Sequence, residues 1–510
     1  MQRAFKSLFP ALAMALLLGA CSATVNWDYP RVSSTAFTHP ETTSVGGLFK
    51  EAADRHPGLS GFSLVQFGES AFLSRLAMID LAEKSVDAQY YIWDADTTGR
   101  ILAERLMRAA DRGVRVRLLI DDFYQTGDKD SVIALMDAHP NIEVRVFNPV
   151  TNRFWRNVSF LSDFSRLNHR MHNKLLAVDN ALGIVGGRNI ADIYFGVSQD
   201  HNYRDLDVLA AGPVVRELSA SFDTFWNSDS AVPVGAVVKD LPTEKDLQAG
   251  RERLGEKIAA AGFPYPMYKN VDEVRARLVQ IRDNFIWAPG RVLVESPSRV
   301  ATVESGVIHK ALSQRVSEVE RELLIESPYF VLPDSVIERV GALTARGVKV
   351  RALTNSAASN DVIAAHAFYA RTREKLLKAG FELYELRPDT NMEKHWSVVS
   401  GKSRAALHCK AIVFDRKSVF IGSFNLDPRS STLNTEIGVM IDSPEIAGRV
   451  AKIMDEGVAP GSAFRVTLDG DDSLLWSAGE KVEYHKDPET NAWHRFLFGF
   501  VGILPIKGLT

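Results

Sequence analysis

The chain has 510 residues, which is long enough for two or three domains, because single hydrophobic cores rarely grow beyond about 300 residues. Its hydrophobic fraction of 46% and charged fraction of 24% are ordinary for a globular protein. A formal net charge of −3 excludes an overall positive field that would attract nucleic acid, although it does not exclude a local basic groove, and two cysteines exclude a cysteine-rich zinc site.

The N-terminus has the order of an export signal. Two basic residues precede an apolar run from Leu8 to Leu18, and small residues follow it up to Cys21. The run is too short for an ordinary membrane span. Its end resembles a bacterial lipoprotein processing site, which implies that residues 1–20 are removed and Cys21 is lipidated, and Ser22 after it implies sorting to the outer membrane. The alternative is a plain secretory signal with an incidental cysteine.

Residues 21–45 are polar and turn-rich, which indicates a tether between the lipid and the folded body. We therefore expect a protein anchored in the bacterial cell envelope, on the outer membrane facing the periplasm. The partner implied is the membrane surface, reached through the N-terminal lipid. With Cys21 lipidated, Cys409 has no cysteine left to pair with, so no intrachain disulfide can form.

A long repeat follows the tether. It consists of a strand, a helix, a short Gly turn and a second strand, at 86–93, 99–110, 112–114 and 115–120, and again at 323–330, 335–345, 346–348 and 349–353. This order predicts a right-handed parallel crossover in each copy. The two Arg-Gly-Val turns lie 234 residues apart, which indicates duplication of a whole domain rather than a solenoid.

The predicted class is therefore α/β with two similar domains. We expect the first domain at 46–227 and the second at 291–465. Pro-interrupted, charged helical stretches at 228–290 indicate a connecting insertion between them, and residues 466–510 form an aromatic C-terminal segment.

Both copies carry the pattern H-x-K-x4-D-x6-G-(G/S)-x-N. Its chemically distinctive members are His172, Lys174, Asp179 and Asn189 in the first copy, and His408, Lys410, Asp415 and Asn425 in the second. Six positions are constrained, so a chance match has a probability on the order of 10⁻⁸ per starting point. Two matches stand 236 residues apart, in step with the crossover repeat. The motif is therefore a strong signal.

The spacing has a structural reason. Side chains two apart on a strand share a face, so each His should stand beside its Lys. The Asp comes where the strand ends, and a hairpin would bring the Asn back to the pair. Two such clusters facing each other would place two imidazoles, two ammoniums and two amides around one small anion. That arrangement suits a phosphodiester, whose displacement develops negative charge.

These paired motifs resemble those of the phospholipase D superfamily over nearly the whole mature chain. The resemblance implies two domains, each a mixed sheet flanked by helices, related by a pseudo-two-fold axis with one shared site. It also implies that His172 attacks phosphorus to form a phosphohistidine and that His408 is the general acid and base, although the order of these two roles stays open. Lys174, Lys410, Asn189 and Asn425 would hold the phosphate, and no metal or cofactor is required.

A nucleophilic imidazole needs an acceptor on its other nitrogen to fix its tautomer. By the same resemblance these acceptors are Glu436 and Asp205, with Asp207 as the alternative to Asp205. Asp179 and Asp415 belong to the motif, yet their turn position favours a structural role over direct chemistry.

Residues around the motifs resemble those of bacterial cardiolipin synthases, namely 167–171, 187–192 with 194–196, and 425–430 with 434–436. Most of these synthases carry N-terminal membrane spans, so this chain is most similar to the C type, which has a lipoprotein-like signal. The implied reaction makes cardiolipin from phosphatidylglycerol and a second phospholipid, expected to be phosphatidylethanolamine. The alternatives are a hydrolase that releases phosphatidic acid, a nuclease of the superfamily, and a non-enzymatic lipid-binding protein. Net charge and the lipid anchor argue against nucleic acid as a partner, and the sequence does not predict the oligomeric state.

Two aromatic segments bear on access to lipid. One, at 153–166, alternates aromatic residues with arginines just before His172, and the other runs from Trp493 to Leu509. Either segment could lie in the membrane interface, or both could pack on the protein body.

Overall fold

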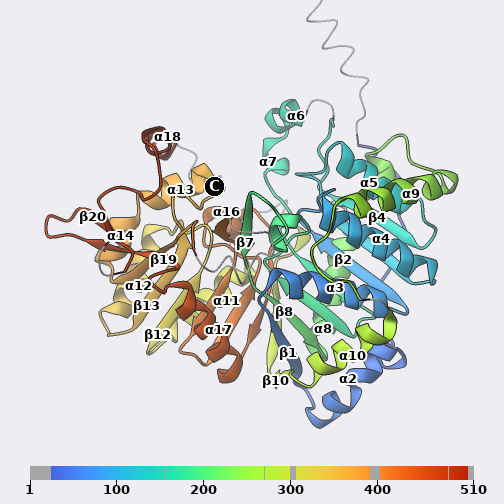
Figure 1. The fold of residues 1–510 in the computed structure, drawn as a ribbon, viewed down its shortest axis with the longest axis horizontal. Helices are drawn as coiled ribbons and strands as arrows, with labels where there is room; N and C mark the ends of the chain where they lie inside the picture. The colour runs from blue at the N-terminus through green and yellow to red at the C-terminus, as the bar shows by residue number, and fades with distance from the viewer. Residues whose placement is uncertain are drawn as a thin grey trace, which may run out of the picture.

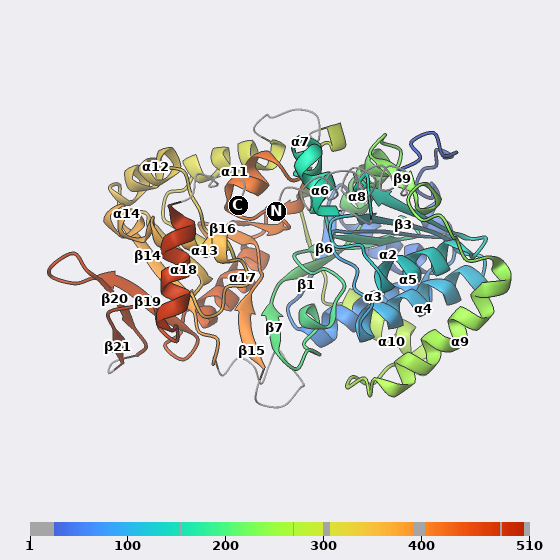
Figure 2. The ribbon, with the colours of Figure 1, turned by 90° about the horizontal axis from the view of Figure 1, so that it is seen from above.

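The structure is a computed structural model that describes residues 25–153, 156–268, 270–298, 306–390, 403–479 and 482–503. The predicted signal peptide and Cys21 lie outside these residues. Within them the chain forms two large mixed sheets that lie side by side, each with helices on its faces (Figures 1 and 2).

The first sheet has the strand order β10-β1-β8-β6-β5-β2-β3-β4-β9. Its strands are β1 (Ser60–Val65), β2 (Ser85–Tyr90), β3 (Arg115–Asp121), β4 (Ile142–Phe147), β5 (Leu175–Val178), β6 (Leu182–Gly186), β8 (Asp207–Ala211), β9 (Ala231–Pro233) and β10 (Ile286–Ala288). The neighbours β2, β3 and β4 are parallel, and the other pairs are antiparallel.

The second sheet has the order β11-β18-β17-β16-β12-β13-β14-β19-β20-β21. Its strands are β11 (Gly290–Val294), β12 (Glu322–Glu326), β13 (Lys349–Asn355), β14 (Phe381–Leu386), β16 (Ala411–Phe414), β17 (Ser418–Gly422), β18 (Ile437–Ile441), β19 (Ala463–Leu468), β20 (Leu474–Ser477) and β21 (Glu483–Tyr484). The run β11 to β14 repeats the order of β1 to β4 strand for strand. The duplication expected from the sequence is therefore confirmed in the topology.

The helices cover the outer faces of the sheets and fill the space between them. They are α2 (Ser44–Arg55), α3 (Gly68–Leu81), α4 (Thr97–Asp111), α5 (Asp128–Asp137), α6 (Arg156–Ser162), α7 (Phe164–Leu167), α8 (Pro213–Trp226), α9 (Glu244–Ala260), α10 (Val271–Arg282), α11 (Val307–Ser317), α12 (Asp334–Thr344), α13 (Ile363–Ala370), α14 (Arg373–Lys378), α16 (Pro428–Thr432), α17 (Pro444–Gly457) and α18 (Ala492–Gly502). Helices α8 and α17 bury apolar faces in a core that includes strands of both sheets, so the two halves share one interior.

The crossovers form as predicted, with β2, α4 and β3 in the first half and β12, α12 and β13 in the second. Gly113 and Gly347 both have φ of +88°, which explains why glycine stands in each Arg-Gly-Val turn. The first strand of each crossover is shorter than predicted. β2 ends at Tyr90 because the backbone N–H of Ile92 turns toward the side chain of Asn189, and this shortening brings the chain to the edge where the motifs lie.

Residues 228–290 contain β9, η3 (Val234–Ala236), α9, α10 and β10. The strands β9 and β10 lie at the two edges of the first sheet, and α9 and α10 pack on α4 and α3. Residues after 465 complete β19, add β20 and β21 to the second sheet, and end in α18, which packs on α13.

The two halves interlock through their backbones as well as their cores. Strand β7 (His201–Arg204) of the first half pairs in parallel with β15 (Arg404–Leu407) of the second. On the other side, Met171 bridges to Thr435, and the N–H of His172 donates to the Thr435 carbonyl at 2.9 Å. Each motif histidine is therefore anchored to the opposite half, since the N–H of His408 likewise donates to Arg204 of β7 at 2.8 Å.

Candidate active site

Each motif histidine bonds to a carboxylate of the opposite half. Nδ1 of His172 lies 2.9 Å from Oε2 of Glu436, and Nδ1 of His408 lies 2.6 Å from Oδ2 of Asp205. All four residues are buried. In the imidazole tautomer that donates from Nδ1, Nε2 is left with a lone pair and points away from the carboxylate. The arrangement thus holds two oriented imidazoles at the junction of the two halves.

The sheet register explains why Asp205 and not Asp207 fills this place. Gly186 of β6 pairs with Asp207, whereas its counterpart Gly422 of β17 pairs with Gly438. Asp207 is therefore equivalent to Gly438, and Asp205 is equivalent to Glu436. Asp207 instead forms buried ion pairs with Arg75 and Arg188 at 3.0 and 3.3 Å.

The neighbouring residues 187 and 423 differ between the halves. A Cβ on Gly187 would stand 2.2 Å from Oδ1 of Asp205, so the carboxylate occupies space that only glycine leaves. In the second half, the Ser423 hydroxyl donates to Glu436, and Ser430 donates to its other oxygen at 2.7 Å. The sequence analysis missed both serines, although the G/S variation in the motif was the signal that could have revealed Ser423.

The motif lysines lie beside their histidines, although in extended segments just ahead of β5 and β16 rather than within those strands. Nζ of Lys174 donates to the carbonyl of His172, and Nζ of Lys410 donates to that of His408, both at 2.5 Å. Neither ammonium forms an ion pair with an Asp or Glu in the part of the chain that the structure describes. Both are buried, so their positive charges lack a protein counter-ion in contact.

The motif asparagines are also buried at this edge. Asn189 accepts from the N–H of Ile92 at 3.1 Å and donates to the Tyr194 hydroxyl at 2.9 Å. The buried side-chain oxygen of Asn425 has no hydrogen-bond partner among the described residues.

Asp179 and Asp415 lie at the far ends of β5 and β16, in two-residue turns with positive φ. Each carboxylate accepts three backbone N–H groups from the segment at the start of the neighbouring strand, which is β2 in the first half and β12 in the second. For Asp179 these belong to residues 83–85, and for Asp415 to residues 320–322. Both carboxylates are thus engaged in joining strands, away from the histidines, which supports the structural role favoured in the sequence.

Burial dominates the electrostatics of the site. It lowers the pKa of His172 to about 4, against the raising effect of the adjacent Glu436. Burial, together with Lys410 and Lys174, holds the pKa of His408 well below its usual range. Both imidazoles are therefore neutral at pH 7. A bound phosphodiester anion would offset the lysine charges and raise both pKa values.

Tyrosines surround the histidine pair. The ring of Tyr91 lies 5.0 Å from His172, and the rings of Tyr194 and Tyr203 lie 5.0 and 4.9 Å from His408. The ammonium of Lys174 is 5.4 Å from the Tyr91 ring. Tyr91 and Tyr203 were not singled out as site residues in the sequence, whereas Tyr194 belongs to the segment 194–196 that resembles cardiolipin synthases.

Cys409, between His408 and Lys410, is buried, and burial raises the pKa of its thiol well above the usual range. It is therefore not a reactive thiolate at neutral pH. No group of three or more His, Cys, Asp or Glu side chains that could hold a metal ion occurs among the described residues.

The arginines of the segment at 153–166 are held by carboxylates. Arg153 pairs with Asp122 at 2.5 Å and Asp130 at 2.8 Å, and Arg166 pairs with Asp163 at 2.7 Å. Phe154 and Trp155 lie outside the described residues. The side chain of Phe164 is 45% exposed, so part of this segment does face outward.

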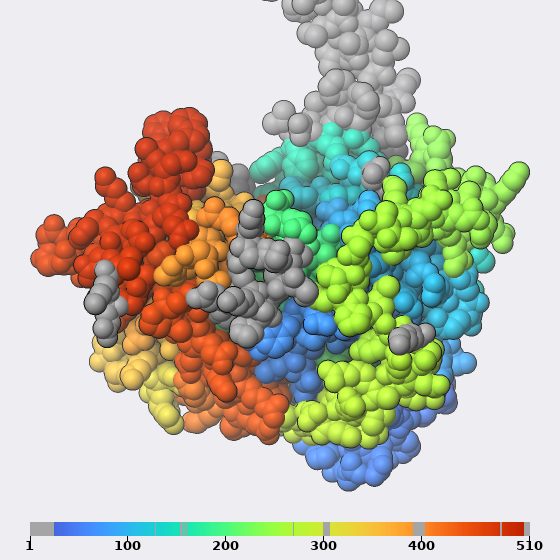
Figure 3. Space-filling view, viewed as in Figure 1, coloured from blue at the N-terminus to red at the C-terminus, as the bar shows by residue number. Residues whose placement is uncertain are grey.

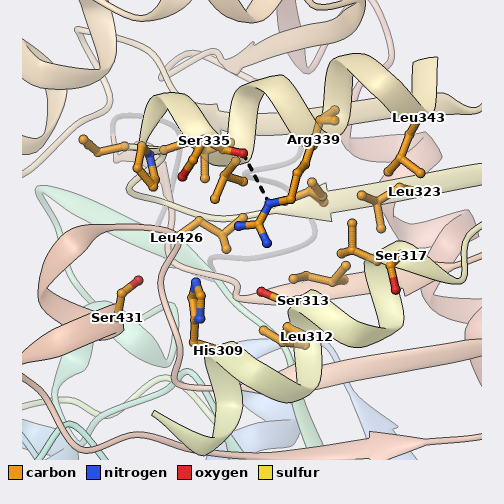
Figure 4. A pocket seen from close by; sticks show the side chains of 18 of the residues that line it. His309, Leu312, Ser313, Ser317, Leu323, Ser335, Arg339, Leu343, Leu426 and Ser431 are labelled. Carbon is orange, nitrogen blue, oxygen red and sulfur yellow. Dashed lines mark hydrogen bonds between the residues drawn. The ribbon is translucent and has the colours of Figure 1, made fainter. Parts of the chain in front are cut away.

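A separate apolar cavity of about 650 Å³ lies between α11 and α12 (Figure 4). Leu312, Leu323 and Leu343 line it, and the guanidinium of Arg339 points into it. Helix α16 separates it from the histidines, since Ser430 faces Glu436 while Ser431 lines the cavity. The cavity is therefore distinct from the place where the motif histidines, lysines and asparagines meet.

The comparisons with known proteins agree with this geometry. A family model described as "Cardiolipin synthase, PLD-like domain" matches residues 76–226 and 312–457, which together make up more than half of the chain. The chain belongs to this family. The two matched segments fall on the two halves of the fold. The resemblance to the phospholipase D superfamily and the duplicated fold that it implies are therefore both confirmed. Membership of this phospholipase D-like family makes the protein an enzyme of the phospholipase D type.

Family members named as cardiolipin synthases are similar over most of the chain. The chain is 37% identical over 474 residues to cardiolipin synthase C of Escherichia coli (strain K12), an alignment that covers 89% of this chain and 97% of that protein. It is 31% identical over 491 residues to an uncharacterized protein of Helicobacter pylori (strain ATCC 700392 / 26695), covering 94% and 95%. It is 24% identical over 399 residues to a cardiolipin synthase of Oceanobacillus iheyensis, covering 78% and 68%.

Among solved structures, phosphatidylserine synthase of Haemophilus influenzae Rd KW20 aligns with a TM-score of 0.54 and 14% identity, covering 81% of this chain and 91% of that one. At this identity the likeness shows the fold alone. Among the described residues of this chain, no helix is long and apolar enough to cross a membrane.

Proposed function

We propose that this protein is a phosphatidyltransferase that makes cardiolipin from phosphatidylglycerol and a second phospholipid, expected to be phosphatidylethanolamine. The observation that carries the proposal is the crossed pair of buried histidine–carboxylate contacts, His172 with Glu436 and His408 with Asp205, beside two buried lysines. The names of the similar proteins, cardiolipin synthases from several bacteria, support the choice of substrate.

The proposed reaction has two displacements at phosphorus. Nε2 of His172 attacks the phosphodiester, and the bond to the headgroup oxygen breaks. His408, which takes up a proton at Nε2 when the bound phosphate raises its pKa, gives that proton to the leaving oxygen. His408, now neutral, takes the proton of a phosphatidylglycerol hydroxyl. The resulting alkoxide attacks the phosphatidyl-His172, releases cardiolipin and restores the free imidazole.

The other site residues have supporting roles in this proposal. Lys174 and Lys410 neutralise the phosphate oxygens, and Asn189 and Asn425 help to hold them. Glu436 and Asp205 keep each Nδ1 protonated so that each Nε2 faces the phosphate. The pKa of about 4 for His172 supports its role as a neutral nucleophile at physiological pH. We assign Asp179 and Asp415 to the joining of strands.

The test of this function is mass spectrometry of the products formed by the purified full-length protein with lipid vesicles. Vesicles of phosphatidylglycerol would be compared with and without phosphatidylethanolamine, with His172→Ala as the inactive control. We expect cardiolipin only with the active enzyme, and more of it when phosphatidylethanolamine is present. Phosphatidic acid without cardiolipin would instead indicate a hydrolase. Turnover of single-stranded DNA without any lipid turnover would indicate a nuclease.

We also propose that the protein is lipid-anchored through Cys21 in the bacterial cell envelope, on the outer membrane facing the periplasm. The order of residues in the N-terminal segment supports this proposal. Mass spectrometry of the mature N-terminus would show a diacylglyceryl thioether on Cys21, whereas an unmodified cysteine at an ordinary cleavage site would contradict the anchor.

Helix α18 supports a second contact with the bilayer. Trp493, Phe496, Phe500 and Ile503 follow one another along one face, and they are 62, 58, 51 and 69% exposed. The opposite face packs on α13, where the ring of Phe498 lies 4.7 Å from His366. Figure 3 shows α18, in red, standing out from the surface at the upper left. Exposed aromatic residues on a short helix are typical of insertion into a membrane interface.

A triple variant, Trp493→Ala with Phe496→Ala and Phe500→Ala, is therefore expected to weaken binding to vesicles. The protein would be expressed from residue 22 so that no lipid anchor contributes. Because three aromatic side chains lose their contact with lipid, we expect the vesicle partition coefficient to fall at least about tenfold. The matched control is Val271→Ala, an exposed apolar residue of α10, and this helix lies on the opposite side of the molecule from α18 in Figure 1. Equal binding of the triple variant and the control in a flotation assay would contradict this role for α18.

A further inference from the structure

The surroundings of the two histidines differ in charge although their own contacts are alike. Asp361 acts on the His408 side, where its negative charge raises the pKa of His408 against the dominant effect of burial. Arg429 lies on the His172 side, where it donates to the Asn168 side chain at 2.7 Å. The two charges act in opposite directions on the pKa of Tyr124, which is 43% exposed: Asp361 raises it and Arg429 lowers it. The site is therefore anionic on one side and cationic on the other.

Two phenols hold the Asp361 carboxylate in place. The hydroxyl of Tyr203 donates to it at 2.6 Å, and that of Tyr329 lies 3.0 and 3.2 Å from its two oxygens. The ring of the same Tyr203 stands 4.9 Å from His408. One tyrosine comes from each half of the molecule, so the carboxylate is fixed across the junction, one tyrosine away from the imidazole.

The backbone around Asp361 is tied to the end of strand β15, directly before His408. Ser359 donates to the side chain of Asn355, and Asn355 donates to the Leu407 carbonyl at 2.9 Å. Asn360 accepts the N–H of Val362 at 2.8 Å, which forms a local turn just before α13. The loop therefore places Asp361 relative to His408 rather than leaving it on a free surface segment.

Asp361 is exposed and has no cationic partner. No Lys, Arg or His side chain forms an ion pair with it among the residues that the structure describes. A carboxylate has about four lone-pair positions, and two phenols do not occupy them all. An exposed anion framed by aromatic rings is the chemistry that binds an organic ammonium, through charge, hydrogen bonds and the faces of the rings.

We propose that Asp361, framed by Tyr203 and Tyr329, binds the ammonium group of the phospholipid headgroup that leaves during the first step. The inference rests on the proposed phosphatidyl transfer and adds to it a group that selects the donor. An ethanolamine headgroup has two carbons between its oxygen and its nitrogen, so an ammonium at Asp361 brings that oxygen to the His408 side. The neutral glycerol headgroup of phosphatidylglycerol gains no such charge pairing.

This placement also assigns different roles to the two histidines of the pseudo-symmetric site. If the cationic headgroup leaves on the side of Asp361, the group that protonates its oxygen is His408. The nucleophile is then His172, on the opposite side of phosphorus, as an in-line displacement requires. Asp361 is a substrate-binding residue in this scheme, and it takes no proton.

The test compares full-length wild-type protein with Asp361→Asn, which keeps the size of the side chain and removes its charge. Release of ethanolamine and release of glycerol would be measured with vesicles of phosphatidylethanolamine and phosphatidylglycerol. We expect ethanolamine release to fall about tenfold, the loss of one charge-assisted hydrogen bond, while glycerol release from pure phosphatidylglycerol stays within about twofold. Asp229→Asn, at an exposed carboxylate elsewhere in the first half, is the matched control and should change neither rate. An equal fall in both rates, or no fall in either, would overturn the proposal.

A binding measurement separates this inference from the proposed reaction. Calorimetric titration of the His172→Ala protein with glycerophosphoethanolamine and with glycerophosphoglycerol requires no turnover. We expect tighter binding of the ethanolamine compound, and loss of that preference when Asp361→Asn is added. If the preference is present although the wild-type enzyme makes no cardiolipin, the transferase proposal fails and the ammonium subsite stands. If neither compound is preferred, the subsite is wrong whatever the reaction.

Discussion

The His408→Ala variant is expected to stop after the first displacement, with the phosphatidyl group on His172, when the donor has a leaving group that departs without protonation. With phosphatidyl-p-nitrophenol as donor, p-nitrophenolate departs unprotonated, so His172 can still attack phosphorus. The variant lacks the base that activates the second alcohol, and the phosphatidyl group stays on His172. We expect a burst of about one p-nitrophenolate per enzyme, followed by turnover at least about 10³-fold below the wild type, because one general base contributes about 10²–10⁴.

The location of the adduct decides the order of the two roles. Peptide mass spectrometry under alkaline conditions should find the phosphatidyl group on His172 in the His408→Ala protein. The His172→Ala protein should show no burst, with steady turnover lower by about 10⁴-fold or more, because it lacks the nucleophile. A burst in His172→Ala and none in His408→Ala would reverse the assignment. Absence of a burst in both would contradict covalent catalysis.

The Glu436→Gln variant is expected to lose about 10³-fold in turnover while the fold is kept, because a carboxylate-to-amide change beside a catalytic histidine selects the wrong tautomer. The Gln amide can donate to Nδ1 of His172, which moves the ring proton to Nε2 and removes the nucleophilic lone pair. Asp205→Asn should have a similar effect through His408. Turnover of both variants would be measured alongside their thermal unfolding, so that a loss of activity is not mistaken for a loss of structure.

The pH dependence of the same variant has a definite sign. With a pKa of about 4, His172 becomes neutral and active as the pH rises through about 4. Glu436 raises this pKa against the lowering effect of burial, so its replacement by Gln should move the acid limb of the rate profile to lower pH. Ser423→Ala, which removes one donor to Glu436 and no charge, is the milder control, with a loss below about tenfold. An acid limb that shifts to higher pH in Glu436→Gln would contradict the contact.

The sequence was sufficient for the features whose information is local or repeated. The spacing of His, Lys, Asp and Asn, found twice, indicated the duplication and the chemistry without any tertiary contact. The repeated order of strand, helix, Gly turn and strand located the crossovers, because secondary-structure preference and positive φ are properties of a few consecutive residues. The turn position of Asp179 and Asp415 similarly indicated their structural role.

The pairing of each histidine with the opposite half was beyond local reasoning. Asp205 and Glu436 were identified as acceptors, yet which histidine each one serves depends on how the two sheets pack about their junction. The same packing brings Tyr203 to Asp361, 158 residues further along the chain, where Tyr329 also contacts that carboxylate. Such contacts arise when buried side chains of two separate sheets meet in one core, and no spacing within the chain records them. The motif residues were therefore readable in the sequence, whereas the pairing of each histidine with a carboxylate of the opposite half came from the fold.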